Sequence, residues 1–169
     1  MDIKGFNPRG KTFHFCLDEY SCYRCKTGSC SLDNISLEDL KNISPSDHAH
    51  RENSVEYCRG MAKLFLDHKF TSPATIFLNM KCGHYDFDDG QHRTCVAARI
   101  LQKGGQILLN VDLAEQDCVC RDCLMKAHFR EQENTLTPID KLFSTKKCRN
   151  FVQSEKEYHR CEFMYSFEE

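Results

Sequence analysis

The chain has 169 residues, of which 40% are hydrophobic and 28% are charged, and its formal net charge is -2. This balance is typical of a globular domain with a hydrophobic core. It argues against nucleic-acid binding by the whole surface, which needs a strong basic excess, although a local basic patch stays open. The N-terminal stretch MDIKGFNPRGKTFHF lacks the apolar segment of a secretory signal, and no apolar run is long enough for a membrane span. We therefore expect a cytoplasmic protein that makes no membrane contact.

Residues 1–34 are polar, aromatic and rich in cysteine, with no clear period, which predicts an irregular segment. Further along, a helix is predicted over 54–68, where Tyr57, Met61, Leu64 and Phe65 recur at helical spacing. The remaining elements of the central region are predicted as strands over 75–80, 85–89 and 106–113 and a helix over 94–103.

From residue 116 the composition changes, because QDCVCRDC is rich in thiols. A short helix is predicted over 121–133 and a last helix or turn in LTPIDKLF. The aromatic residues Phe163, Tyr165 and Phe167 alternate with polar ones, which indicates a late edge strand or a partner contact.

Together these elements predict an α+β fold with a small mixed sheet and helices, flanked by cysteine-rich segments that a metal holds together. The expected organisation is a segment over 1–34, a core over 35–115 and a segment over 116–169 that packs on the core.

The DGQHR stretch places Gly90 between a strand and a helix. Free N–H groups at a helix N-terminus favour an anion, and glycine allows it to approach the backbone. Arg93 can clamp phosphate oxygens and His92 can donate a hydrogen bond or carry a proton, while Asp88 and Asp89 can hold Mg²⁺. The alternative is an ordinary strand-to-helix turn with solvated side chains.

A wider pattern surrounds this turn: the helix SVEYCRGMAKLFLDH, a turn with proline, the strand TIFLNM, and then Y-x-F-x-DGQHRTCVAA. In this order of elements, and in the spacing of Gly90, Arg93 and Ala97, residues 35–115 resemble the ParB/sulfiredoxin fold. The resemblance implies that the turn binds phosphates of ATP, ADP or CTP through Gly90, Gln91, His92, Arg93 and Thr94.

The chain also departs from that family. Gln91 stands where sulfiredoxin has its reactive cysteine, so sulfinic acid reduction is not expected. The 54 residues after the core are too rich in cysteine and too weakly helical for the DNA-reading domain of the partition proteins.

Twelve cysteines in a reducing compartment indicate metal ligands or catalytic groups more often than disulfides. Two CxxC pairs, Cys22 with Cys25 and Cys120 with Cys123, predict a tetrahedral metal site, with zinc as the expected ion. An iron–sulfur cluster, a redox pair and reduced buried thiols are the alternatives. Cys82 is interpreted as a core residue, and His84 as a surface or hydrogen-bonded histidine.

The resemblance favours hydrolysis or transfer of a nucleotide phosphate with Mg²⁺, in which His92 and Arg93 stabilise charge. Asp89, Asp47 and Glu52 are the candidate metal ligands or bases, and His48 shares the loop of Asp47 and Glu52 and is a further candidate. The alternatives are a ParB-like nuclease or a non-catalytic, zinc-stabilised module that binds DNA or protein. The DNA- or protein-binding module would use the basic residues near the CxxC pairs: Arg24, Lys26, Arg121, Lys126, Lys146, Lys147 and Arg149. The sequence also leaves open whether the protein forms a homodimer.

Overall fold

The computed structural model of the chain describes residues 1–44 and 51–168. Glu52 lies within these ranges, whereas the candidate residues Asp47 and His48 lie outside them. Among the described helices, none is long and apolar enough to cross a bilayer.

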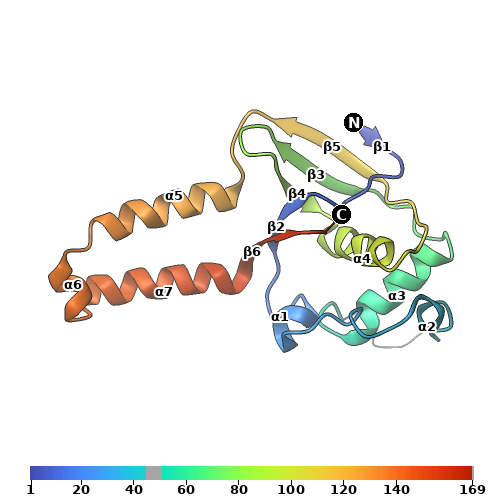
Figure 1. Ribbon diagram of the computed structural model, residues 1–169, viewed down its shortest axis with the longest axis horizontal. Helices are drawn as coiled ribbons and strands as arrows, with labels where there is room; N and C mark the ends of the chain where they lie inside the picture. The colour runs from blue at the N-terminus through green and yellow to red at the C-terminus, as the bar shows by residue number, and fades with distance from the viewer. Residues whose placement is uncertain (45–50, 169) are drawn as a thin grey trace.

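A six-stranded mixed sheet with the order β1-β5-β3-β4-β2-β6 organises the described residues (Figure 1). The pairs β2·β4 and β3·β5 are parallel, and the pairs β1·β5, β3·β4 and β2·β6 are antiparallel. The strands are β1 (Asp2–Ile3), β2 (Thr12–Cys16), β3 (Ala74–Asn79), β4 (His84–Asp89), β5 (Val111–Gln116) and β6 (Glu162–Ser166).

One face of this sheet carries the hydrophobic core, because aromatic side chains alternate along neighbouring strands. Phe13 of β2 is fully buried, and its ring centroid lies 5.0 Å from that of Tyr85 and 5.4 Å from that of Phe87. Phe15 stacks in the same way on Phe163 of β6. The residues between these aromatics therefore point to the opposite face.

Helices α1 to α4 lie on the core side of the sheet (Figure 1). Ala97 and Ala98 of α4 are fully buried, so this helix can approach its neighbours closely. The helices are α1 (Tyr23–Thr27), α2 (Leu37–Lys41), α3 (Val55–Leu66), α4 (Gln91–Gln102), α5 (Arg121–Asn134), α6 (Pro138–Leu142) and α7 (Lys146–Cys161).

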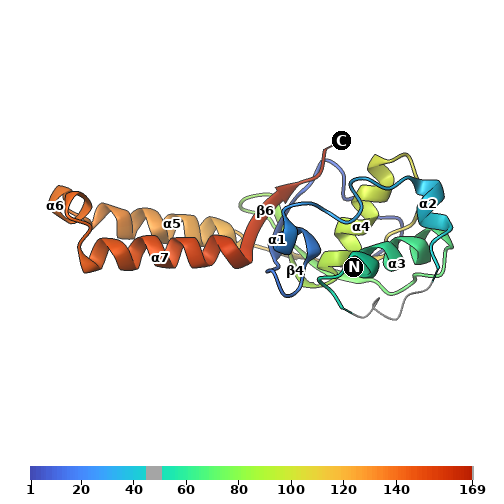
Figure 2. The same cartoon turned by 90° about the horizontal axis from the view of Figure 1, so that it is seen from below.

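Helices α5, α6 and α7 form an arm that extends away from the sheet (Figures 1 and 2). Phe129 of α5 packs edge-on against Tyr158 of α7, with ring centroids 5.6 Å apart. At the tip, Thr137 and Asp140 form a capping box that starts α6, and Pro138 occupies its first turn. The chain returns from α7 directly into β6, so both ends of the arm are anchored at the sheet.

The predicted α+β class with a mixed sheet is confirmed, and β6 is the predicted edge strand. Strands come from all three expected segments, since β1 and β2 precede residue 35 and β6 follows residue 116. Two predicted elements have different bounds, since α4 begins at Gln91 and β5 covers 111–116. The prediction of an irregular segment over 1–34 is wrong, because β1, β2 and α1 lie there, and a helix of 16 residues covers 146–161, where no period was found.

Candidate metal centre and phosphate cavity

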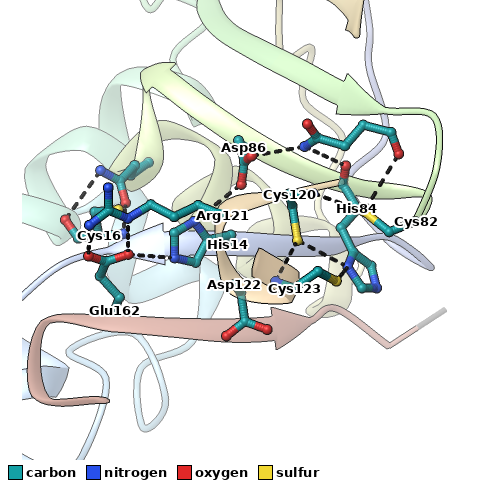
Figure 3. Close-up of polar contacts among 12 residues, drawn as sticks. His14, Cys16, Cys82, His84, Asp86, Cys120, Arg121, Asp122, Cys123 and Glu162 are labelled. Carbon is teal, nitrogen blue, oxygen red and sulfur yellow. Dashed lines mark hydrogen bonds and ion pairs between the residues drawn. The ribbon is translucent and has the colours of Figure 1, made fainter. Parts of the chain in front are cut away.

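Four ligand atoms from Cys82, His84, Cys120 and Cys123 lie within 4.8 Å of one another (Figure 3). Three thiols and one imidazole are a donor set that holds structural zinc in proteins. The group joins the turn between β3 and β4 to the first turn of α5, at the base of the arm.

Local backbone structure places each of these side chains. In the turn, Gly83 has a positive φ of 72° and its N–H donates to the Asn79 carbonyl, which sets Cys82 and His84 on either side of a tight bend. Cys120 is the N-cap of α5, and its Sγ accepts the N–H of Cys123 at 3.5 Å. The Cys120 N–H in turn donates to Cys82 Sγ at 3.2 Å.

The distances fit a tetrahedral ion. The Nδ1 atom of His84 lies 3.4 Å from Cys120 Sγ and 3.6 Å from Cys123 Sγ. With Zn–S near 2.3 Å and Zn–N near 2.0 Å, a tetrahedral site separates sulfur from nitrogen by about 3.5 Å. This group could therefore hold a metal ion such as zinc without rearrangement of the backbone.

The pKa values of the three thiols differ within this group. Burial raises the pKa of Cys120 to about 12 and also raises that of Cys123. Burial acts in the same direction on Cys82, but hydrogen bonds from the N–H groups of Cys120 and His84 outweigh it and lower the Cys82 pKa. Cys82 is thus the thiol that ionises first, and a bound cation would favour ionisation of the other two.

The structure brings Cys120 and Cys123 together with each other but not with Cys22 and Cys25. Cys22 is the N-cap of α1 and Cys25 lies within this helix; both pack against the hydrophobic core, and the Cys25 thiol donates to the Leu17 carbonyl at 3.4 Å. Burial raises the Cys25 pKa to about 12. The two candidate ligands that sequence reasoning missed, Cys82 and His84, form a C-x-H pair in a predicted turn, and that spacing was the available signal.

The DGQHR turn has the predicted backbone form. Gly90 is the N-cap of α4 with φ 96°, a left-handed conformation that favours glycine. A Cβ atom at this position would lie 2.8 Å from Ala74 Cα and closer still to Ala74 Cβ. The close approach of α4 to β3 therefore requires glycine here, and it leaves the first N–H groups of α4 at the end of the sheet.

Arg93 ties this turn to the loop before β3. Its guanidinium forms an ion pair with Asp89 and donates to the carbonyls of Ser72 and Pro73. The guanidinium also lies over the Phe70 ring, 6.0 Å from the centroid. Only 13% of the Arg93 side chain is exposed, so these contacts hold the guanidinium in one place.

The other residues of the turn point in different directions. Gln91 binds the backbone of Cys16, accepting its N–H at 2.7 Å and donating to its carbonyl at 3.4 Å. Thr94 is fully buried, and its hydroxyl has no hydrogen-bond partner among the described residues. The His92 ring packs edge-on against Tyr57 and lies 3.7 Å from Cys58 Sγ; burial lowers its pKa, so the imidazole is neutral at pH 7.

Two cavities meet at this turn. A polar cavity of about 260 Å³ is bounded by all five residues of the DGQHR stretch, and also by Asp88, Glu52 and Cys16. A larger groove of about 770 Å³ runs along α3 to Phe70 and Ser72. Tyr57, Met61 and Arg93 line both.

Comparison of the chain with protein-family models, with curated proteins and with solved structures found no match.

Proposed function

We propose that this is a zinc-stabilised nucleotide-binding protein. The phosphates bind in the polar cavity at the N-terminus of α4, and the base lies in the adjoining groove along α3. The observation that carries this proposal is the pair of cavities that share Tyr57, Met61 and Arg93. A nucleotide needs two adjoining cavities of this kind, a polar one for its phosphates and a largely apolar one for its aromatic base.

The proposed phosphate contacts are the backbone N–H groups that begin α4, together with Arg93. The side chains of Gln91 and Thr94 are less suited, since the first holds Cys16 and the second is buried. Asp88, Asp89 and Glu52 line the same cavity, and their carboxylate oxygens fit Mg²⁺ that accompanies a nucleotide. Hydrolysis or transfer of a phosphate is the proposed chemistry, with charge neutralisation by Arg93 and Mg²⁺ as its main source.

In the same proposal, zinc bound by Cys82, His84, Cys120 and Cys123 is structural. All four positions of a tetrahedral ion would be filled by protein atoms, which is typical of structural rather than catalytic zinc. The ion would fasten the arm to the sheet. The grouping of thiols as candidate metal ligands, rather than in disulfides, fits a reducing, cytoplasmic compartment.

The test is a thermal-shift screen of the zinc-loaded protein against ATP, ADP, CTP and GTP, with and without Mg²⁺. We expect one nucleotide to raise Tm in the wild type and to lose this effect in Arg93→Ala. Because that variant also loses contacts to the loop before β3, Asp88→Asn provides a second probe at an exposed position. Asp88→Asn should lose the part of the Tm increase that depends on Mg²⁺ and keep the part that the nucleotide causes without Mg²⁺.

Arg130→Ala is the matched control, since it removes an exposed arginine on α5. Its nucleotide-induced shift should equal that of the wild type. If none of the nucleotides raised Tm, nucleotide binding would be contradicted, whereas the proposal of a zinc site would not be affected.

A second candidate is a module that binds DNA through the arm. The tip joins exposed apolar side chains (Ile139, Leu142 and Phe143) to basic residues (Lys141, Lys146, Lys147 and Arg149). The other basic residues considered from sequence are spread over α1 and the base of the arm. The test is DNA affinity against salt, in which Lys146→Ala with Arg149→Ala should reduce the slope of log K by about 2.

A further inference from the structure

A second group of potential metal ligands lies on the sheet face opposite the hydrophobic core. One ligand atom each from His14, Cys16 and Glu162 lies within 4.8 Å of the other two (Figure 3). The group is separate from the four-ligand cluster, and it shares no residue with it. It belongs to two paired strands rather than to a loop.

The strand register explains the arrangement. Cys16 of β2 is directly opposite Glu162 of β6, and His14 precedes Cys16 by two residues, so the three side chains leave the same face. The Cys16 backbone is further held by the Gln91 amide on both its N–H and its carbonyl. Three donors on such rigid elements are positioned before a ligand binds.

His14 is the most informative member of the group, because it is only 3% exposed. Its Nδ1 atom lies 3.2 Å from Asp86 Oδ1, and the other carboxylate oxygen of Asp86 accepts from Asn79 Nδ2 at 2.9 Å. Its Nε2 atom is buried and makes no hydrogen bond to a described residue, although it lies 3.1 Å from Glu162 Oε2. The Nε2 atom, which makes no hydrogen bond, thus faces the Glu162 carboxylate.

This pattern is the one that metal-binding histidines show in proteins. A carboxylate fixes one ring nitrogen, and the other nitrogen faces the ion. In a tetrahedral zinc site, nitrogen and oxygen ligands lie about 3.3 Å apart, close to the observed 3.1 Å between His14 and Glu162. The combination of thiolate, imidazole and carboxylate suits zinc better than Mg²⁺ or Ca²⁺.

We propose that His14, Cys16 and Glu162 bind a second zinc-class divalent ion whose fourth position is open. Three protein ligands with one exchangeable position are typical of catalytic zinc sites. Cys16 also lines the polar cavity of the DGQHR turn, so the open position would accept water or an oxygen of a molecule bound there. Only this last point rests on the proposed nucleotide function; the ion itself binds independently of it.

Arg121 is the residue that competes with the ion. Its guanidinium holds the Glu162 carboxylate at 2.7 Å and 2.8 Å and is 62% exposed, so it can swing into solvent. Arg121 stands between Cys120 and Cys123 in sequence, which places it beside the first metal site. Removal of its charge should therefore tighten the second site without removing a ligand of the first.

The experiment is a Co²⁺ titration of the metal-free, reduced full chain, followed by the thiolate-to-cobalt charge-transfer band and by metal analysis after gel filtration. We expect two ions per wild-type chain and one in Cys16→Ser, whose remaining ion keeps the strong absorption of a three-thiolate site. Glu162→Gln should weaken only the second ion, by about 100-fold or more, because it loses a charged ligand. Arg121→Gln should bind the second ion more tightly than the wild type.

Cys148→Ser is the control, since it removes a thiol on α7 that belongs to neither group. It should still bind two ions. A single ion in the wild type, or two ions in Cys16→Ser, would overturn the second site. Because no nucleotide is present, these results stand apart from the thermal-shift screen, and a failure of either proposal can be distinguished from a failure of the other.

Discussion

The Nδ1 atom of His84 lies 3.4 Å from the Sγ atom of Cys120, although 36 residues separate the two in sequence. The chain leaves β5 next to the end of β3, where Met80 N–H donates to the Gln116 carbonyl and Lys81 N–H to that of Cys118. The parallel pairing of β3 with β5 therefore carries the start of α5 to the β3–β4 turn. A metal at this point would close the connection between sheet and arm.

Substitution of His84 by alanine should remove the first metal and destabilise the protein. At a free metal concentration about 1,000 times Kd, binding contributes about 4 kcal/mol to the free energy of unfolding. For a chain of this size, its loss corresponds to a decrease in Tm of about 8–16 °C. We expect the same decrease in Tm when a chelator removes this metal from the wild type. In His84→Ala, the chelator should lower Tm only by the amount that loss of a second ion causes.

Cys25→Ser is the control for this experiment, because it alters the other CxxC pair. Its metal content and its response to the chelator should match those of the wild type. If Cys25→Ser instead lost metal and His84→Ala kept it, the ligand set of the first site would be the one predicted from sequence.

Local sequence patterns located the centre of the fold but not β1 and β2. β-branched and aromatic residues located β3 and β4 within one residue, and the spacing of Tyr57, Met61 and Phe65 located α3. Each of these elements buries one face, so its apolar residues recur with a period of 2 in a strand or 3.6 in a helix, which can be found in the sequence. The arm helix α7 was missed although its period is present: Cys148, Phe151 and Tyr158 recur at helical spacing on its less exposed side, which packs on α5.

The ligand set of the metal site depends on contacts between distant segments. By spacing alone, Cys22 and Cys25 are equivalent to Cys120 and Cys123. The strand order distinguishes them, because it brings residues 116–123 to the β3–β4 turn and leaves α1 on the core side. Likewise, no local pattern shows that Gln91 holds Cys16 across 75 residues.

Gly90→Ala should destabilise the protein more than Gly28→Ala. Both glycines have positive φ, 96° and 83°, so each substitution costs about 1–2 kcal/mol for the left-handed backbone. Only at Gly90 would the new methyl group also overlap Ala74, which adds about 1–3 kcal/mol. Urea denaturation should therefore give a total loss of about 2–5 kcal/mol for Gly90→Ala. Equal losses in the two variants would contradict the close approach of α4 to β3.

Asp140 should titrate at an unusually low pH. Hydrogen bonds from the Thr137 side chain and backbone and from the Thr145 hydroxyl lower its pKa to about 2. Because the folded pKa lies below the unfolded value, the capping interaction is fully present above about pH 4 and is lost as the pH falls toward 2. NMR titration of the carboxyl carbon should give this pKa in the wild type and a higher one in Thr137→Val.

Thr135→Val tests whether that change is specific to the capping box. The Thr135 hydroxyl donates to the Gln132 carbonyl and does not contact Asp140 in the described structure. The Asp140 pKa should therefore be unchanged in Thr135→Val. A wild-type value near 3.8 would show that the tip of the arm does not hold its capping box in solution.

His92 should make the protein less stable in mild acid. Burial lowers its pKa, against smaller opposing effects of Glu52 and of a hydrogen bond with the Ser21 backbone. The unfolded chain protonates this imidazole near pH 6.5, whereas the folded protein does so only at lower pH. Below about pH 6.5 the unfolded state therefore binds more protons, and stability falls by at most about 1.4 kcal/mol per pH unit until the folded pKa is reached.

His92→Phe isolates this effect, because it keeps an aromatic ring against Tyr57 and cannot titrate. Urea denaturation at pH 7 and pH 5 should show a smaller loss of stability in the variant than in the wild type. Equal losses would mean that His92 titrates normally and faces solvent. In that case the imidazole would be free to carry a proton in the cavity, as expected from the sequence, and the neutral state at pH 7 inferred from its burial would be wrong.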